Sequence, residues 1–316
     1  MDVRQLSTLV AIADHGTFSA AARALFTVQS NVSGHIARLE KELGVTLVDR
    51  ANGGLTEEGA RVVERARRIL HEIDDITSDM ASRDADVSGQ TRLGVIGTTA
   101  RWLMPQFLSR LDQDHPNVRS VIFEGATSTL VPGILSGQLN GAIVHLPIDD
   151  AEVLIEPLFA EDLFLLVADG HPLATGAKEL PLTALDDVPL LLPPTGSPLR
   201  RVLDRAASTA GITLTAQAEI DGVRLMASLA FDGFGGAIVP STAAPLWVDG
   251  DFQRITVPEL PRRVVAFVRR RRPAASAPTR AALETLRSVI GEHATRQPGV
   301  HPEAAALHLS PSAARA

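Results

Sequence analysis

The sequence predicts an α/β protein that carries a helix-rich N-terminal domain with a winged helix-turn-helix, followed by a long linker helix. Apolar residues recur at helical spacing up to Gly44, and a heptad pattern follows them. From about residue 91 onward, short β-rich runs alternate with helical stretches, as in layered α/β domains. A chain of 316 residues and 33.6 kDa is long enough for two or three compact units.

The composition excludes several classes of protein. No apolar run approaches the roughly 20 residues that span a bilayer, and the N-terminus lacks the pattern of a secretory signal. We therefore expect a cytoplasmic protein with no membrane partner. The chain has no cysteine, which excludes disulfides, thiolate metal sites, cysteine nucleophiles and thiol-based redox sensing.

The charge balance argues mildly against a nucleic-acid partner. The formal net charge is -7, and cations and acids balance within the first 55 residues. A neutral module can still bind DNA when its cations face one side and a dimer doubles the contacts, but we expect modest, salt-sensitive affinity. The balancing residues are Arg4, Arg23, Arg38, Lys41 and Arg50 against Asp2, Asp14, Glu40, Glu42 and Asp49.

Three helices are predicted in the first 44 residues. The first covers residues 2–15 and ends at Gly16, a residue that often terminates helices. A second, short helix has Ser19 available as its N-cap and a compact alanine face. The third runs from about 29 to 43 and is polar on its free side. Two helices joined by a tight turn in this way form a helix-turn-helix.

A wing and a long helix are predicted next. Residues 45–48 favour a strand, and the turn at 52–54 reverses the chain toward Leu55 and Thr56. A helix then continues to about Arg83, with apolar residues at alternating steps of four and three, a pattern by which two helices pair. The alternative is an amphipathic helix lying on its own domain, but no adjacent core is evident that would cover so long a seam. We therefore expect dimerisation through Val62, Ala66, Ile69, Ile73, Ile76 and Met80.

The remaining chain predicts α/β layers with a largely parallel sheet. After a linker at 86–90, seven apolar runs are candidate strands: 93–96, 121–123, 142–144, 163–167, 190–192, 237–239 and 264–268. Residues 291–316 are rich in Ala, Pro, Ser and His without periodicity, which predicts a disordered tail.

The N-terminal residues resemble a known family. GTFSAAARALFTVQSNVSGHIARLEKELG at 16–44 resembles the helix-turn-helix signature of LysR-type transcriptional regulators, and DRANGGLTEEG at 49–59 resembles the wing and linker-helix start that follow it. The resemblance continues more weakly at 157–174 and 232–240. It implies a DNA-binding domain over 1–58 and a linker and dimerisation helix over 59–88. It also implies a periplasmic-binding-protein-like effector domain over 89–290, with lobe I at 91–161 and 265–290 and lobe II at 162–264.

The resemblance also implies partners. A homodimer, and by effector-domain contacts a homotetramer, would bind an interrupted inverted repeat in double-stranded DNA, and a small-molecule effector would change whether RNA polymerase is helped or blocked. Three departures stand out. Val28 and Ser30 replace a serine and a proline that the family often has, so Thr27 is a candidate cap for the recognition helix. Gly34 replaces a longer polar side chain, and the wing lacks arginines at 51–54.

The free face of the third helix carries the candidate DNA contacts. Asn and Gln can read adenine, Arg can read guanine or hold a phosphate, and serines usually hold phosphates. For an isolated helix we would expect such a face simply to be solvated; within this signature we expect DNA contact. The candidates are Gln29, Ser30, Asn31, Ser33, His35 and Arg38, with Arg50 beside the wing.

Two strand-to-helix turns, GTT at 97–99 and TST at 127–129, predict an anion site. Hydroxyls and free N–H groups at helix N-termini bind anions, and ligands of open α/β folds sit at the carboxyl ends of strands. We expect a small effector with a carboxylate or another anionic group, although each serine or threonine can also serve only as a helix cap. The candidate effector residues are Thr98, Thr99, Arg101, Thr127, Ser128, His145, Thr195 and Ser197.

No motif nominates a catalytic centre, and we expect no enzyme activity, cofactor or metal. Neither H-E-x-x-H nor G-x-S-x-G occurs, and Gly233, Gly235 and Gly236 fit no phosphate-loop spacing. The sequence therefore favours a DNA-binding regulator modulated by a small effector. Two alternatives stay open: a solute-binding module that senses its ligand without DNA, and an α/β enzyme fused to an interaction domain.

Overall fold

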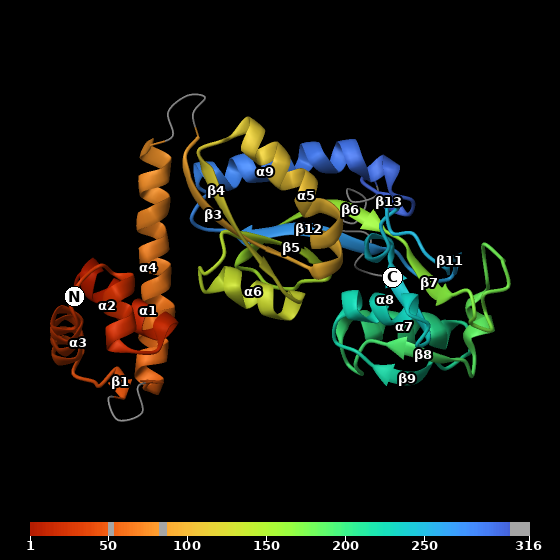
Figure 1. Cartoon of the computed structure of the whole chain (residues 1–316), viewed down its shortest axis with the longest axis horizontal. Coiled ribbons are helices and arrows are strands. Elements are labelled where there is room, and N and C mark those ends of the chain that lie inside the picture. The colour runs from red at the N-terminus through yellow and green to blue at the C-terminus, as the bar shows by residue number, and fades with distance from the viewer. Residues whose placement is uncertain (50–53, 82–86, 304–316) are drawn as a thin grey trace.

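The computed structural model describes residues 1–49, 54–81 and 87–303, which form an N-terminal helical domain, a long helix and two α/β lobes (Figure 1). The predicted fold class is thus confirmed. In the N-terminal domain the helices α1 (Val3–His15), α2 (Phe18–Ala24) and α3 (Gln29–Leu43) follow the predicted bounds closely. Their apolar faces meet in one core built mainly from Leu9, Ile12, Ala21, Val32, Ile36, Leu39 and Leu47.

Two glycines end helices in this domain as predicted. Gly16 closes α1 at a φ of 75°, and Gly44 closes α3 at a φ of 72°. Residues with a Cβ are strained in this left-handed region, so glycine ends both helices at little cost. At the other end of α1, Asp2 and Gln5 form a reciprocal capping box.

Both predicted caps of the helix-turn-helix are wrong by one or two residues. Thr17, not Ser19, caps α2 and accepts a hydrogen bond from the Ala20 N–H at 3.1 Å. The N-cap of α3 is Val28, which offers no side-chain acceptor. The hydroxyl of Thr27 instead accepts a hydrogen bond from the Asn31 side chain at 3.0 Å. Thr27 therefore accepts from a side chain of α3 and not from a backbone N–H of that helix, so it does not cap α3.

The wing and the linker helix follow. Strands β1 (Val48–Asp49) and β2 (Gly54–Leu55) pair antiparallel, so the strand predicted over 45–48 contributes only its last residue. The turn between them, with Arg50, lies outside the described residues. Helix α4 (Glu57–Ala81) then begins so close to Leu47 that a Cβ on Gly59 would lie 2.0 Å from the Leu47 carbonyl oxygen.

The predicted seam of α4 is only partly free in a single chain. Val62 packs half-buried against the N-terminal core, and Ala66 is 1% exposed. The expectation that no core covers this part of the helix is therefore wrong for Val62 and Ala66, because α1 packs along it. Ile69, Ile76 and Met80 are exposed by 42%, 62% and 70%, with Ile73 half-buried beside them. These four residues form the apolar stripe that remains.

Lobe I is a six-stranded sheet in the order β13-β6-β12-β5-β3-β4. Helices α5 and α9 cover one face and α6 the other (Figure 1). Trp102 of α5 packs edge-to-face on Phe159 of β6 in its core, with ring centroids 5.4 Å apart. Its elements are β3 (Gly89–Val95), α5 (Gly97–Asp114), β4 (Val118–Glu124), α6 (Thr127–Leu135), β5 (Gly141–His145), β6 (Val153–Glu161), β12 (Arg263–Arg270), α9 (Ala277–His293) and β13 (Val300–His301).

Lobe II is a five-stranded sheet in the order β11-β7-β10-β8-β9. Alternate residues of β7 point to opposite faces. Leu163, Leu165 and Val167 join the core under α7, whereas Phe164 and Leu166 join the core under α8, so the two helices cover opposite faces. The elements are β7 (Leu163–Ala168), β8 (Pro189–Leu192), α7 (Pro198–Thr209), β9 (Thr215–Glu219), α8 (Val223–Phe231), β10 (Gly236–Pro240) and β11 (Phe252–Thr256).

The sheets are mixed, which corrects the prediction of a largely parallel sheet. Strands β3, β4 and β5 run parallel, as do β8, β9 and β10, but β6, β7, β11 and β12 join by antiparallel pairing. The chain crosses from lobe I to lobe II between β6 and β7 and returns between β11 and β12, and all four of these strands pair antiparallel. Only Asp162 separates β6 from β7, and residues 257–262 lead back to β12. Six of the seven predicted strands lie wholly within observed strands, and the run 93–96 ends one residue beyond β3. Strands β6, β9, β11 and β13 were missed.

The prediction of a disordered tail from residue 291 is wrong for residues 291–303. Helix α9 continues to His293, and Val300–His301 adds a strand to the edge of lobe I. The His301 Nε2 lies 2.9 Å from a carboxylate oxygen of Asp162, which ties this segment to the lobe crossing. Residues 304–316 of the predicted tail lie outside the described residues.

The second half of α4 is docked on lobe I. The Arg270 guanidinium donates to Glu72 at 2.8 Å, and the first N–H of α9, at Ala277, donates to Asp79 at 2.7 Å. Between them the Asn140 amide lies 2.6 Å from the Nε2 of His71. Burial lowers the pKa of His71, consistent with a neutral ring that accepts this hydrogen bond. One helix thus contacts both the N-terminal domain and lobe I.

Candidate functional site

The free face of α3 presents polar groups to solvent. Gln29, Ser30, Asn31 and Arg38 are exposed, and Ser33 is half-buried. These positions share one side of the helix because Val32, Ile36 and Leu39 turn the other side into the core. The arrangement is that of a helix that can enter a major groove.

Three of these side chains are oriented by hydrogen bonds that leave recognition groups free. Gln29 accepts from the Ser19 hydroxyl at 2.8 Å, so its amide N–H₂ remains available. Asn31 donates to Thr27, which leaves its carbonyl oxygen available. The Arg38 Nε donates to the Gly34 carbonyl at 3.1 Å, and both terminal amino groups remain available. Oriented side chains lose less entropy when they bind a base edge.

His35 is placed differently from the other predicted DNA contacts. It is half-buried, and its Nδ1 lies 3.0 Å from the hydroxyl of Thr8, which is 1% exposed in α1. This contact holds the ring against α1 rather than on the free face. Arg50 lies outside the described residues.

Two cavities lie between the lobes. The smaller, about 300 Å³, lies where the N-termini of α5, α6 and α8 converge; we call it the polar chamber. First-turn N–H groups have no partner within their helices, so these three ends favour an anion. Five predicted effector residues line the polar chamber: Thr98, Thr127, Ser128, His145 and Ser197.

The other three predicted effector residues do not line either cavity. Thr99 is fully buried in the first turn of α5, and Arg101, two residues further along that helix, is half-buried. The Thr195 hydroxyl donates to Glu219 at 2.6 Å, an arrangement in which it orders a loop. Ser197, although it lines the polar chamber, also caps α7 through the Arg200 N–H at 3.3 Å.

A buried ion pair stands at the lobe crossing behind the polar chamber. The Arg263 guanidinium donates to Glu161 at 2.6 Å and to the Thr98 hydroxyl at 3.0 Å. The second carboxylate oxygen of Glu161 accepts from the Thr242 N–H of lobe II at 3.0 Å. Glu161 is fully buried and Arg263 nearly so. These contacts join the cavity, lobe I and lobe II through two charged side chains.

A second ion pair bridges the mouth of the polar chamber. Arg224, from the first turn of α8 in lobe II, donates to Glu124 at the end of β4 in lobe I, at 3.1 Å. The Glu124 carboxylate also lies over the start of α5, since a Cβ on Gly97 would be 2.9 Å from its Oε1. The chain's own carboxylate thus occupies a position that suits an anion.

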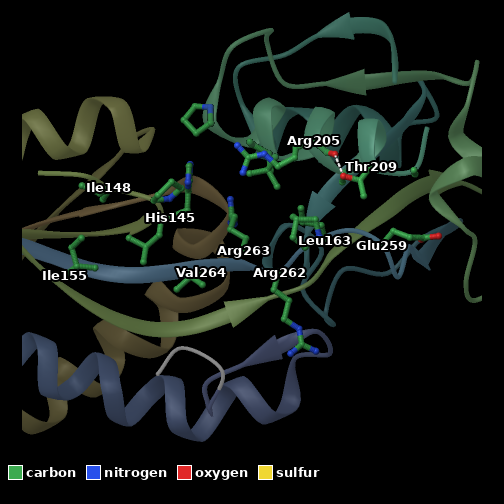
Figure 2. Close-up of a pocket in the computed structure, with 18 residues that line it drawn as sticks. His145, Ile148, Ile155, Leu163, Arg205, Thr209, Glu259, Arg262, Arg263 and Val264 are labelled. Atoms are coloured by element: carbon green, nitrogen blue, oxygen red, sulfur yellow. Dashed lines mark hydrogen bonds between the residues drawn. The ribbon is translucent and has the colours of Figure 1, made fainter. Parts of the chain in front are cut away.

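The larger cavity, about 910 Å³, lies between α7 and the sheet of lobe I; we call it the apolar chamber (Figure 2). Its surface is mostly aliphatic, and four residues are shared with the polar chamber: His145, Pro198, Leu199 and Arg263. Burial, and secondarily the nearby Arg263 charge, lowers the pKa of His145 to about 4. The ring between the two chambers is therefore neutral near pH 7.

Sequence reasoning missed the two ion pairs and the apolar chamber. Glu161 and Arg263 stand at strand ends with no motif around them, and they are 102 positions apart in the chain. The one available signal was a pair of charged residues next to long apolar runs, PLFAED and RRVVAFV. Charges beside buried strands are seldom left without a partner.

Comparison with known proteins identifies the chain. Residues 3–60 match "Bacterial regulatory helix-turn-helix protein, lysR family", and residues 84–291 match "LysR substrate binding domain". The chain belongs to the LysR family of transcriptional regulators. This confirms the resemblance seen in the sequence, and a transcriptional regulator rather than an enzyme is what the family implies.

Several LysR relatives are named as activators of hydrogen peroxide-inducible genes. The "DNA-binding transcriptional dual regulator OxyR" of Escherichia coli strain K12 is 30% identical over 92% of this chain and 95% of that protein. A "Probable hydrogen peroxide-inducible genes activator" of Mycobacterium leprae is 33% identical over 76% of this chain and 78% of that protein. A full-length cysteine-to-aspartate variant of Pseudomonas aeruginosa OxyR superposes with a TM-score of 0.70 at 25% identity, over 92% of this chain and 97% of that one.

This LysR regulator differs from a thiol sensor in its chemistry, because it has no cysteine. The sequence printed above therefore offers no thiol that an oxidant could modify. In the described ranges no helix is long and apolar enough to cross a membrane. Nor do those ranges contain a group of three or more potential metal-binding side chains.

Proposed function

We propose that this LysR regulator responds to a small anionic molecule bound in the polar chamber, and not to peroxide through a thiol. The observation that carries the proposal is the hydroxyl of Thr127. Its Oγ1 is out of contact with solvent and has no hydrogen-bond partner among the described residues, although Thr127 lines the chamber at the N-terminus of α6. A buried hydroxyl without a partner costs about 1–3 kcal/mol, which a ligand acceptor would recover.

The charges around the polar chamber support an anion that competes with Glu124. Thr98 is already held by Arg263, so the cation is positioned at the back of the cavity. At the mouth, Glu124 is the one side-chain partner of Arg224 among the residues that the structure describes, and both side chains are about half exposed. An incoming carboxylate can replace Glu124 over the α5 N-terminus and release or re-pair Arg224. Because that ion pair bridges the lobes, its exchange would change their relative arrangement.

On the DNA side, we propose that Gln29, Ser30, Asn31, Ser33 and Arg38 contact the operator, with two copies of α3 in successive major grooves. The N-terminal domain has little net charge, so a monomer would bind weakly and a dimer is needed to double the phosphate contacts. The free apolar stripe of α4 would hold the two chains together. His35 is left out because it is bonded to Thr8.

The route between the sites would run through α4. Lobe I holds this helix through Arg270, Asn140 and Ala277, and the same helix packs on α1 of the DNA-binding domain. An effector can bias this arrangement only by binding one arrangement more tightly than another. A change between the lobes would then alter the spacing of the two recognition helices in a dimer.

The test is fluorescence anisotropy of the purified chain with DNA from upstream of its own gene and with a scrambled duplex, over a salt series. Preferential, salt-dependent binding is expected; Gln29→Ala should relax the preference, and the matched control Gln113→Ala on α5 should not. Arg38→Ala should weaken all sequences and lower the salt slope by about 1. Equal weak binding to both duplexes, with or without an anion, would favour a ligand-binding module that does not use DNA.

The polar chamber is tested by thermal shift with sulfate, malonate and succinate as probes. Stabilisation by one of these anions should be lost in Thr127→Val and kept in the matched control Thr129→Val, an exposed residue of the same helix that does not line the chamber. An anion response that survives Thr127→Val would place the anion elsewhere.

A further inference from the structure

The apolar chamber is three times larger than the polar chamber, at about 910 Å³ against 300 Å³, and has a different surface. One side is lobe I, with Leu146 and Ile148 after β5, Ile155 of β6 and Val264 of β12. The other side is α7 of lobe II. Its volume is within the range of cavities that hold small organic ligands, and aliphatic walls of this kind favour an apolar ligand body.

The charged side chains around the apolar chamber are not equivalent. Arg263 is paired with Glu161, and Arg262 donates to Asp162 at 2.8 Å. Figure 2 shows that Arg262 and Glu259 point away from the cavity, whereas the Arg205 guanidinium extends from α7 toward lobe I. Arg205 has no side-chain hydrogen bond or ion pair to any described residue. The chamber therefore combines an aliphatic surface with one unneutralised cation at its edge.

We propose that the apolar chamber is a ligand site of its own, which binds a hydrophobic carboxylate with its hydrocarbon part against lobe I and its carboxylate on Arg205. The two chambers adjoin at His145, Pro198, Leu199 and Arg263, which line both, and their other lining residues differ, so the apolar chamber is a distinct neighbouring site. A ligand here contacts both lobes, from Ile148 on one side to Ala206 on the other. It would therefore act on the same arrangement of lobes as the anion in the polar chamber.

The charge complementarity is tested by isothermal titration calorimetry of the full chain with octanoate and with 1-octanol. The two probes share an apolar body and differ in charge. Octanoate should bind more tightly to the unaltered chain by about fivefold, the upper range for a solvent-accessible ion pair. Arg205→Gln should remove this difference, and the matched control Arg201→Gln, one turn earlier on α7 and outside both chambers, should keep it.

The location is tested by filling the chamber from each lobe. Ala206→Phe on α7 and Ile148→Trp on lobe I should each weaken octanoate by more than about tenfold, because a ring takes the space of the hydrocarbon chain. Ser208→Phe, on the exposed side of α7, is the matched control and should bind normally. A thermal melt of each variant verifies that it is folded. If one of the two filling variants does not fold, the other still tests the location.

The proposal is overturned if octanoate fails to bind the unaltered chain. A second copy of the chain that covers the chamber would give this result. It is also overturned if binding survives both filling variants. Loss of octanoate binding in Thr127→Val would place the probe in the polar chamber and overturn the separate site while supporting the proposed function. Failure of DNA binding or of the anion response, with octanoate binding intact, would affect the proposed function alone.

Discussion

Replacing Glu161 by glutamine keeps the shape of the side chain and removes its charge, leaving Arg263 as a buried cation without a counter-charge. The Arg263 side chain is 7% exposed, and its partner carboxylate is 2.6 Å away and fully buried. Removing one member of such a pair costs about 3–5 kcal/mol. Glutamine can still accept one hydrogen bond from Arg263, so we expect a loss near the lower end, about 3 kcal/mol.

Fluorescence can isolate this effect in lobe I. The chain has two tryptophans, and a Trp247→Phe background leaves Trp102, which is 3% exposed and packs on Phe159 of the strand that carries Glu161. With a urea dependence of about 2–3 kcal/mol per M, a loss of about 3 kcal/mol lowers the unfolding midpoint by about 1–1.5 M. The matched control is Glu156→Gln on the same strand.

The control pair is exposed, so its removal should cost less than about 1 kcal/mol: Glu156 accepts from Arg287 at 2.6 Å on the surface of lobe I. A midpoint in Glu161→Gln that moves no more than in Glu156→Gln would refute the reasoning. The double variant Glu161→Gln with Arg263→Met should lose less stability than the two single losses added together. Strict additivity would show that the two charges do not stabilise one another.

Three further predictions concern other parts of the chain. The folded pKa of His145, about 4, lies below its ordinary 6.5, so the unfolded chain binds the proton more tightly; stability is full above about pH 6.5 and falls by up to about 3 kcal/mol as the pH drops to 4. His145→Gln should flatten that part of a urea-midpoint profile, and a profile as steep as that of the unaltered chain would contradict it. Gly59→Ala must push α4 off the Leu47 carbonyl and should lower the free energy of unfolding by more than about 2 kcal/mol. Gly34→Ala, with nothing within 4 Å of the added Cβ, should raise it by up to about 1 kcal/mol through helix propensity. Equal shifts in melting temperature for the two variants would disprove this. Finally, Ile76→Glu should halve the mass in light scattering while the control Thr77→Glu leaves it unchanged, and an unaltered mass for both would remove the α4 stripe from the dimer.

The sequence was sufficient for features that depend on local pattern. The three N-terminal helices follow from their apolar periodicity and from Gly16 and Gly44, and the family follows from residues within a single stretch of about 30 positions. The seven apolar strand runs were also found, because each reads as a continuous hydrophobic segment. Six of them are buried along their length, whereas Phe123 of β4 is 46% exposed. Strand β9 escaped detection because all five of its residues are exposed.

The polar chamber was partly foreseeable, because threonines and serines at strand-to-helix turns gather at one end of parallel strands. Thr98, Thr127 and Ser128 were found in this way. Thr99 and Thr195 were not distinguishable from them by sequence, since a hydroxyl that is buried or orders a loop and one that lines a cavity have the same local pattern.

What the sequence by itself determined is a LysR-type chain without a thiol, because motif spacing and the absence of a residue type are properties of the chain alone. Only the tertiary structure decided that Val62 and Ala66 of the seam are covered by α1, that Glu161 meets Arg263, and that Ile148 faces α7 across a cavity. These contacts join segments tens to a hundred residues apart in the chain. The first contact is set by how α4 packs against α1, and the other two by how the chain crosses twice between the lobes. No local periodicity encodes either geometry.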